Sequence, residues 1–240
     1  APQIGALTAE LDPVANAALM VHTNRTDNPH GVTAPQIGAL TNELDLAALR
    51  AYHYGSPDIV ESPAEWFVFN GAGTITAFNW EAGRTNVVIP WAIGGVPVTT
   101  IGTEAFQMSG IVSVIAPKTV TTIGSYAFNF CYALASVSLP LAQTVGAYAF
   151  NGCDALTSVS LPQAQTVGEG AFNGCSLLAS ISLPQAQTVG AFAFESCGVL
   201  ASVYFDNNAP TIGEGIFAGI TPPPNVYVTD PQATGWGDTW

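Results

Sequence analysis

The segment Ile123-Gly124-Ser125-Tyr126-Ala127-Phe128 decides the fold, because it returns along the chain at a spacing of 22 residues. Downstream copies follow in register, and the last of them comes one residue late: Val145 to Phe150, Val167 to Phe172, Val189 to Phe194 and Ile212 to Phe217. An early copy spans Ile101 to Phe106. Self-similarity at a fixed period of about 20 to 50 residues indicates a solenoid or a similar stacked array.

Each copy is followed by a cysteine and by a short alternating segment. Cys131 stands three residues after Phe128, and Val137 and Leu139 then alternate with serine. The next coils repeat these positions: Cys153, Leu156, Val159, Leu161; Cys175, Leu178, Ile181, Leu183; Cys197, Leu200, Val203, Phe205. Alternation with a period of two predicts a strand with one buried face, and a proline such as Pro140 ends it.

A single strand of this kind cannot bury its apolar face, so we expect the coils to stack. Stacking places Leu on Leu, Phe on Phe and Cys on Cys in continuous ladders. With strands about 4.8 Å apart, five to six coils form a rod roughly 25 Å long. The glycine of each copy is expected where a Cβ would clash. The fold class predicted is mainly β, a solenoid of 22-residue coils with capping segments.

The N-terminal part repeats with a different period, of about 33 residues. Residues 1–7 return as 34–40, with the word A-P-Q-I-G-A-L in both places. Thr33 and Gln36 have capping-box spacing, which predicts a short helix from Ala34. Thr41 could open another helix. Short helices with apolar faces need a partner, so this part is expected to oligomerise.

These patterns divide the chain into four segments. Residues 1–55 are expected to be a helical or irregular oligomerising segment, and 101–217 the solenoid. The strand-rich stretch 56–100 is expected to cap one end of the solenoid, and 218–240 the other. Terminal caps are needed because the last coil of a stack otherwise exposes its apolar side.

Composition excludes several classes of partner. Of 240 residues, 48% are hydrophobic and 9% charged, and the formal net charge is −13. The basic residues are Arg25, Arg50, Arg84 and Lys118. Because phosphate binding needs clustered Lys and Arg, neither nucleic acid nor an anionic membrane surface is an expected partner. No apolar run reaches eighteen residues, so membrane insertion is not expected either.

The four cysteines could form disulfides, a metal site or a column of buried thiols. Zinc sites use pairs of ligands a few residues apart, whereas these cysteines are 22 residues apart. Stacked cysteines point in parallel, which does not suit disulfide geometry. We therefore predict a ladder of free thiols in the core.

His22 and His30 are the weak candidates for a metal site, because an oligomeric shaft can bring histidines of several chains to one axis. Against this, His30 lies between Pro29 and Gly31 in a sequence typical of a turn. His53 has no evident partner. No cofactor is predicted.

Catalysis is not expected. The serines at 136, 158 and 180 are repeat positions on a strand face. The nearest acids, at 154, 169 and 195, occupy different positions in each coil. No base, orienting acid or carboxylate pair converges on a nucleophile, as an active site requires.

The exposed side chains are the remaining candidates for function. The strand face offers mainly Ala and Ser, and Tyr204 interrupts it. Aromatic residues recur at one variable position of the repeat, as Tyr126, Tyr148 and Phe192, and Tyr132 heads another loop. These five residues are the candidates for receptor binding. The alternative is that they pack against a neighbouring coil or another chain.

The units with I-G-x-x-A-F-x-x-C-x-x-L-x-x-V-x-L-P resemble BspA-type leucine-rich repeats, over about residues 65 to 240. The segment from Val87 to Gly102 is similar to the entry segment of that family. The early coil departs from the pattern, since Met108 or Ser109 stands where Cys is expected and Ala116 replaces the last Leu. The resemblance implies a leucine-rich-repeat solenoid used in surface attachment or protein binding, without catalysis.

The segment 22–40 resembles a repeat of bacteriophage and prophage tail fibres, because residues 26–39 read T-D-N-P-H-G-V-T-A-P-Q-I-G-A. This resemblance implies a fibre shaft, commonly homotrimeric, that carries a receptor-binding tip. The expected function is thus a distal tail-fibre protein of the virion that binds a bacterial surface receptor, protein or glycan, by multivalent adhesion. The alternatives are a BspA-like cell-surface adhesin and a glycan depolymerase, which would need an acid pair in a groove.

Overall fold

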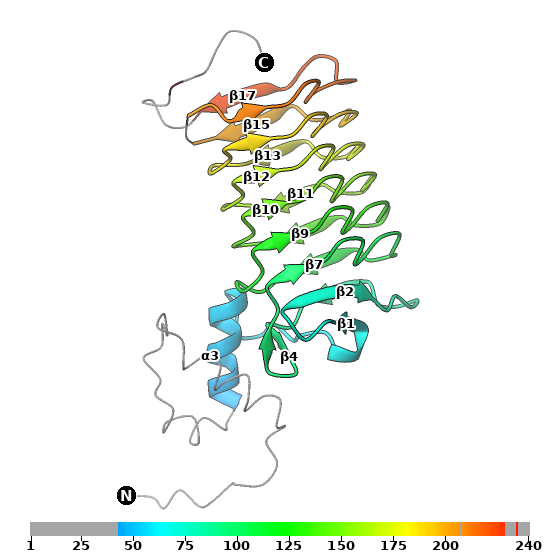
Figure 1. Cartoon of the computed structure of the whole chain (residues 1–240), viewed down its shortest axis with the longest axis vertical. Coiled ribbons are helices and arrows are strands. Elements are labelled where there is room, and N and C mark those ends of the chain that lie inside the picture. The colour runs from blue at the N-terminus through cyan, green and yellow to red at the C-terminus, as the bar shows by residue number, and fades with distance from the viewer. Residues whose placement is uncertain (1–42, 207, 229–233, 235–240) are drawn as a thin grey trace, which may run out of the picture.

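The computed structural model describes residues 43–206, 208–228 and 234, which form an elongated stack of coils with one helix beside its N-terminal end (Figure 1). The mainly β solenoid predicted from the repeat is confirmed. We name each coil by its phenylalanine, from the Phe106 coil to the Phe217 coil. In chain order the elements are α3 Glu43–Tyr54, η1 Ala64–Trp66, β1 Phe67–Phe69, β2 Thr74–Phe78, β3 Asn86–Val88, β4 Ala92–Ile93, β5 Val96–Pro97, β6 Thr100–Ile101, β7 Ser113–Ile115, β8 Thr122–Ile123, β9 Ser136–Ser138, β10 Thr144–Val145, β11 Ser158–Ser160, β12 Thr166–Val167, β13 Ser180–Ser182, β14 Thr188–Val189, β15 Ser202–Phe205, β16 Thr211–Ile212 and β17 Asn225–Val228.

One wall of the solenoid is a sheet that runs its whole length. Its strand order is β1-β2-β6-β8-β10-β12-β14-β16, antiparallel between β1 and β2 and parallel from β2 onward. The register sets like residues opposite each other, so Thr144 pairs with Thr122 and with Thr166. The next residue in each strand, such as Val145, points into the core and is buried. The threonines therefore form an outward column along this wall.

The opposite wall carries the alternating S-V-S strands, and it is divided in two. One sheet has the order β11-β9-β7-β3 and the other β13-β15-β17. Val137 and Ile181 are buried, as the period of two predicts, and their serine neighbours are not. No strand pairing joins β11 to β13, and Val159 at this break is only partly buried. The ladder between β12 and β14 continues on the other wall and holds the two halves together.

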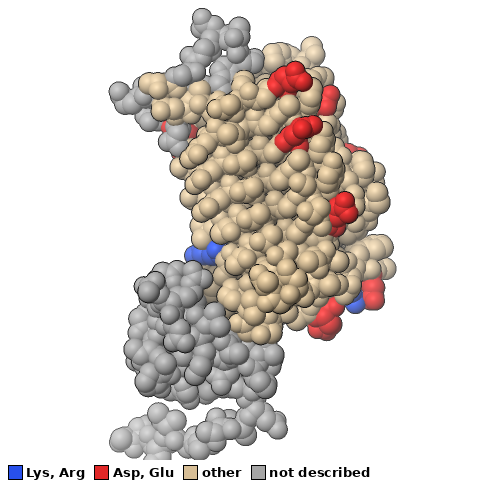
Figure 2. Space-filling view, viewed as in Figure 1, with Lys and Arg blue, Asp and Glu red and all other residues tan. Residues whose placement is uncertain are grey.

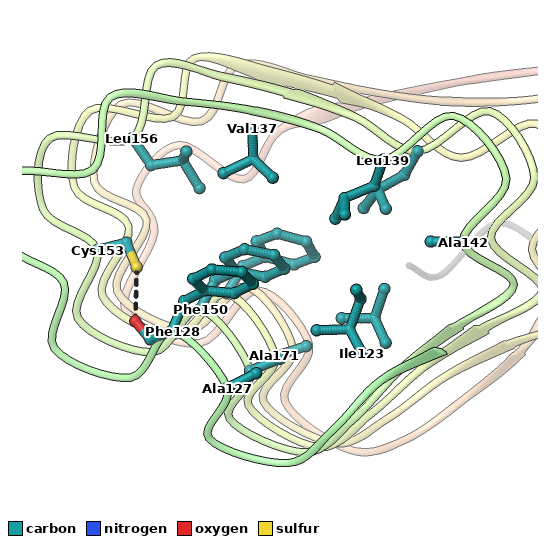
Figure 3. Packing of buried hydrophobic residues seen from close by; sticks show 14 of the residues in the cluster. Ile123, Ala127, Phe128, Val137, Leu139, Ala142, Phe150, Cys153, Leu156 and Ala171 are labelled. Atoms are coloured by element: carbon teal, nitrogen blue, oxygen red, sulfur yellow. Dashed lines mark hydrogen bonds between the residues drawn. The ribbon is translucent and has the colours of Figure 1, made fainter. Parts of the chain in front are cut away.

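The core is a column of stacked rings between the two walls (Figure 3). The ring centroids of Phe128 and Phe150 are 5.1 Å apart, and the ring planes differ by 6°. Phe172 continues the column at 5.2 Å from Phe150. All three rings are fully buried. Burial of side chains this large contributes about 1.5–3 kcal/mol each before conformational entropy is subtracted.

Aromatic residues of β1 and β2 close the N-terminal end of the column. Phe78 of β2 stacks on Phe106 at 4.8 Å, and Phe67 of β1 lies edge-on to Phe106. Phe67 is also buried. The strand-rich stretch 56–100 contributes strands β1 to β6 to this end.

Helix α3 belongs to the same end, because its last turn is attached to the cap. His53 is buried and stacks on Trp91 with centroids 4.8 Å apart, which supplies the partner that the sequence left unnamed. The Tyr54 hydroxyl donates to the Glu61 carboxylate at 2.7 Å. Burial raises the pKa of Glu61. The ammonium group of Lys118 lies 5.2 Å from the centre of the Tyr52 ring.

The residues before α3, including the 33-residue repeat, His22 and His30, lie outside the described part of the chain.

At the C-terminal end, β17 extends one wall by pairing with β15 from Asn225 to Val228. The long wall ends at β16, where Ile212 remains 37% exposed. The expected cap of 218–240 thus adds one strand, and most of its last twelve residues lie outside the described part.

Glycines at the corner of each coil allow the stacked backbones to approach closely. A Cβ on Gly168 would lie 2.5 Å from the backbone nitrogen of Ala147, and a Cβ on Gly146 would lie 2.6 Å from that of Ser125. Such distances are shorter than any real Cβ contact, so the expected clash is confirmed. The constraint is the approach of the neighbouring coil, since these glycines do not have positive φ angles.

We expect Gly168→Ala to lower the free energy of unfolding by more than about 2 kcal/mol, because a buried backbone must move to admit the methyl group. The matched control is Gly198→Ala, where nothing lies within 4 Å of the new Cβ. That substitution should be neutral or stabilise the fold by up to about 1 kcal/mol. Urea unfolding followed by circular dichroism measures both, and equal losses would contradict the close-approach argument.

Candidate ligand-binding edge of the solenoid

Each coil turns at one side of the solenoid through two residues in the left-handed backbone conformation. In the Phe128 coil these are Tyr126 (φ 60°) and Phe130 (φ 57°). The two positions form two columns along this side, which we call the edge. The first column contains Glu104, Tyr126, Tyr148, Gly170, Phe192 and Gly215, and the second Met108, Phe130, Gly152, Gly174, Ser196 and Gly219.

Backbone hydrogen bonds between coils impose this conformation. The Tyr126 N–H donates to the Ala147 carbonyl at 2.9 Å, and the Phe130 N–H donates to that of Asn151 at 2.8 Å. The same pattern continues in the next coil, where Tyr148 and Gly152 are the donors. Because glycine adopts positive φ without strain, a bulky residue there costs about 1–2 kcal/mol. An aromatic residue in either column therefore needs a compensating contact or a function.

The first column supplies part of that compensation through stacking. The Tyr126 and Tyr148 rings stack with centroids 5.3 Å apart and planes within 8°. A Cβ on Gly170 would lie 2.3 Å from the Tyr148 ring, so this ring covers the glycine of the next coil. Aromatic pairs of this kind contribute about 0.5–1.5 kcal/mol, comparable to the cost of the backbone conformation.

The Tyr148 hydroxyl donates to the Glu169 carboxylate at 2.7 Å. This hydrogen bond raises the pKa of Tyr148, so the phenol remains protonated and continues to donate. Between the two columns lies a row of amides, in which the Asn151 side chain donates to Asn129 at 2.8 Å. The Asn173 amide donates to Glu195 at 2.6 Å. The edge thus combines ring surfaces, amides and carboxylates.

The five receptor-binding candidates fall into three places. Tyr126 and Tyr148 stack in the first column, and Tyr132, on the same coil as Tyr126, stacks on Phe130 of the second column at 5.7 Å. Phe192 lies two coils from Tyr148 and covers Gly215. Tyr204 is on the strand wall, in register with Tyr227 and stacked on it at 5.0 Å. Packing on a neighbouring coil, which the sequence left open, occurs for Tyr126, Tyr148, Phe192 and Tyr204, whereas Tyr132 packs on its own coil.

Three apolar residues near these tyrosines were missed by the sequence reading, the exposed Met108 and Trp80 and the partly buried Phe130. Met108 and Phe130 belong to the second column, and Trp80 comes from the loop after β2. The signal for the first two was present, because they stand at the same repeat position two residues after the buried Phe. Trp80 carried no such signal, since it reaches the edge only through the fold of the cap.

The cysteines form the predicted column, three residues after each buried phenylalanine. Cys131, Cys153, Cys175 and Cys197 are all buried and free. Each thiol donates to a carbonyl of the preceding coil, for example Cys153 to Phe128 at 3.2 Å (Figure 3). Ser109 occupies the column in the first coil, with its hydroxyl 3.4 Å from the Cys131 sulfur. Burial raises the pKa of Cys153 and Cys175 well above the usual value.

Comparison with known proteins agrees with this architecture. Six copies of the BspA type Leucine rich repeat region match residues 99–222. The chain belongs to the BspA-type leucine-rich-repeat family. No curated protein matches it.

Two crystal structures of leucine-rich-repeat proteins are similar to it. The T. pallidum leucine-rich repeat protein is 29% identical, with a TM-score of 0.60, over 70% of this chain and 86% of that one. A leucine rich cell surface protein of Faecalibacterium prausnitzii A2-165 is 27% identical, with a TM-score of 0.58, over 68% of this chain. This chain covers 48% of the Faecalibacterium protein.

Within the part of the chain that the structure describes, no three His, Cys, Asp or Glu side chains gather into a group that could hold a metal ion. Nor is any helix of that part long and apolar enough to cross a membrane.

We expect the four native cysteines to resist a thiol reagent at pH 8, because they are buried and burial raises the pKa of Cys131, Cys153 and Cys175 so that little thiolate forms. All should react after unfolding in guanidinium chloride. Ser176→Cys places a thiol at an exposed neighbouring position and should react at once. Fast labelling of the unsubstituted protein would show that the column opens in solution.

Proposed function

We propose that the chain is a non-catalytic, cell-surface-type binding protein that attaches to a macromolecular partner through the edge of its solenoid. The observation that supports this most directly is the pair of stacked tyrosines, Tyr126 and Tyr148, held on the edge in a conformation that glycine adopts at lower cost. Backbone strain tends to collect at functional sites. Tyrosines with polar neighbours are suited to protein or sugar recognition.

Family membership supports the same class. Proteins built from such repeats typically serve as binding scaffolds, and the Faecalibacterium relative is described as a cell surface protein. The chemistry of the edge agrees with a binding role. Glu169 is engaged by Tyr148, and Glu195 by the Asn173 amide. The histidine that the structure describes, His53, is buried against Trp91 away from the edge.

Attachment is tested by labelling the purified chain with a fluorescent dye and adding it to immobilised bacterial cells and to surfaces coated with extracellular-matrix proteins. Replacing both tyrosines, Tyr126→Ser with Tyr148→Ser, should weaken binding at least tenfold, as expected for central aromatic anchors. The matched control is Leu141→Ser, which removes a similarly exposed apolar side chain from the other side of the coil. Binding to no surface, or an equal loss in the control, would exclude attachment through the edge.

A second candidate function is that of a tail-fibre tip on a bacteriophage or prophage particle. The word T-D-N-P-H-G-V-T at residues 26–33 and the 33-residue repeat favour it. A homotrimeric shaft would present three solenoids at once, so that weak sites combine into high avidity. In this case the partner is a receptor on the bacterial surface and the location is the virion.

The mass of the purified chain in solution, measured by light scattering, tests the fibre function. We expect a trimer for the whole chain and a monomer after removal of residues 1–42, which leaves α3 attached to its cap. A monomeric whole chain would contradict the fibre shaft and would leave the cell-surface function standing.

A further inference from the structure

The first two coils carry a concentration of exposed apolar side chains that the aromatic stack does not explain. We define the proximal patch as the exposed Trp80, Met108, Val112 and Tyr132 together with the partly buried Phe130. Met108 is 66% exposed, Tyr132 59% and Trp80 48%. Exposed aromatic residues and methionine are enriched in protein interfaces, and a contiguous apolar patch of this kind commonly marks an interaction site.

The patch is continuous across its elements. The Trp80 ring lies against Gly110, where an added Cβ would be 2.6 Å from it. The Met108 N–H donates to the Asn129 carbonyl at 2.9 Å, which places Met108 next to Phe130 in the second column. Phe130 then stacks on Tyr132. The cap loop and both coils therefore contribute to one surface.

Stability of the fold does not account for the exposed side chain of Met108, whereas Phe130 gains a contact by covering Gly152. Met108 and Phe130 have φ angles of 56° and 57°. The same position is glycine in three other coils, at Gly152, Gly174 and Gly219. Glycine there would remove both the backbone strain and the exposed apolar surface. Met108 leaves two thirds of its surface in water, so burial of its side chain would add favourable free energy only when a partner covers it.

Charge decides which partner fits this surface. The chain has no Lys or Arg after Lys118, and acidic side chains lie along the side of the solenoid that carries the edge (Figure 2). Glu104, exposed and one coil from Tyr126, is the first-column residue of the same coil as Met108. Arg84, close to the patch in sequence, is paired with Glu81 at 2.8 Å and lies 5.1 Å from the centre of the Trp66 ring.

We propose that the proximal patch is the docking surface for a protein segment that presents an apolar side chain flanked by Lys or Arg. The apolar side chain packs among Met108, Phe130 and Tyr132, and the basic side chains lie toward Glu104. Basic groups can also stack on exposed tyrosine rings. This proposal rests on the binding function proposed above, and it names the part of the edge and the chemistry of the partner.

The probe is a fluorescein-labelled twelve-residue peptide in which Trp and Leu alternate with Arg, and binding is followed by fluorescence anisotropy. Two other peptides, one with Arg replaced by Glu and one with Trp and Leu replaced by Gly, separate the charge requirement from the apolar one. We expect only the basic apolar peptide to bind, with affinity falling as salt rises from 50 to 300 mM. This increase in salt shortens the Debye length from about 14 to about 6 Å and so screens the attraction between Glu104 and the Arg side chains of the peptide.

Two pairs of variants locate the site. Met108→Ser with Tyr132→Ser should weaken binding about tenfold or more, as for central interface residues. Leu177→Ser with Val199→Ser, a pair of apolar side chains about half exposed on later coils, should change it less than twofold. Glu104→Gln should weaken binding about two- to fivefold, whereas Glu214→Gln, the same charge change on the Phe217 coil, should not.

Equal effects within either pair would mean non-specific attraction to an acidic surface and would overturn the proposal. Binding of the acidic peptide would also overturn the proposal. So would binding of a neutral oligosaccharide when the basic apolar peptide does not bind. Circular dichroism melting of each variant confirms that it is folded. If the unsubstituted protein attaches to cells or matrix through the edge but does not bind the basic apolar peptide, this proposal fails while the binding function proposed above stands.

Discussion

Every coil of this protein depends on the hydrogen bonds that its backbone makes to nearly equivalent repeat positions of the next coil. The Phe128 N–H donates to the Ala149 carbonyl, and the Phe150 N–H to that of Ala171, at 2.7 Å in both cases. Buried backbone groups must be paired, so the paired segments of neighbouring coils must have the same length and shape. This requirement explains why one glycine recurs at each corner and why like side chains lie above one another.

The same requirement creates the edge. Turning the chain within a coil while keeping the bonds between coils sets two residues per coil at positive φ, whatever side chains they carry. Where the position is glycine, the chain adopts the positive φ with little strain. Where it is Tyr126, Tyr148 or Phe192, a ring extends over the following coil and stacks there or covers a glycine. Side-chain choice at these two columns is therefore the main freedom that the solenoid leaves, and function is expected to use it.

The solenoid and its core could be predicted from the sequence because they follow from periodicity. The spacing of Phe128 and Cys131 in each repeat was enough to predict the stacked rings and the buried thiols. The division of the serine wall between β11 and β13 could not be predicted, since the two coils there have almost the same sequence. The place of Trp80 and the attachment of His53 to Trp91 also depend on contacts of the irregular cap, which carry no period.

The arrangement of aromatic residues and glycines on the edge shows how a repeat protein can build a local surface. Tyr148 covers Gly170, Phe130 covers Gly152, and Phe192 covers Gly215, so each ring requires a glycine one coil later. Side chains at neighbouring coils are thereby coupled, although each coil folds by the same backbone rules. Tyr126 is the exception, because its ring meets another ring, and it stands in the coil that also carries Phe130 and Tyr132. On the edge, the exposed aromatic residues Trp80, Tyr126 and Tyr132 thus lie on or beside the coils next to the cap. There, the irregular contacts of Trp80 can add to a surface that repetition alone would spread evenly along the stack.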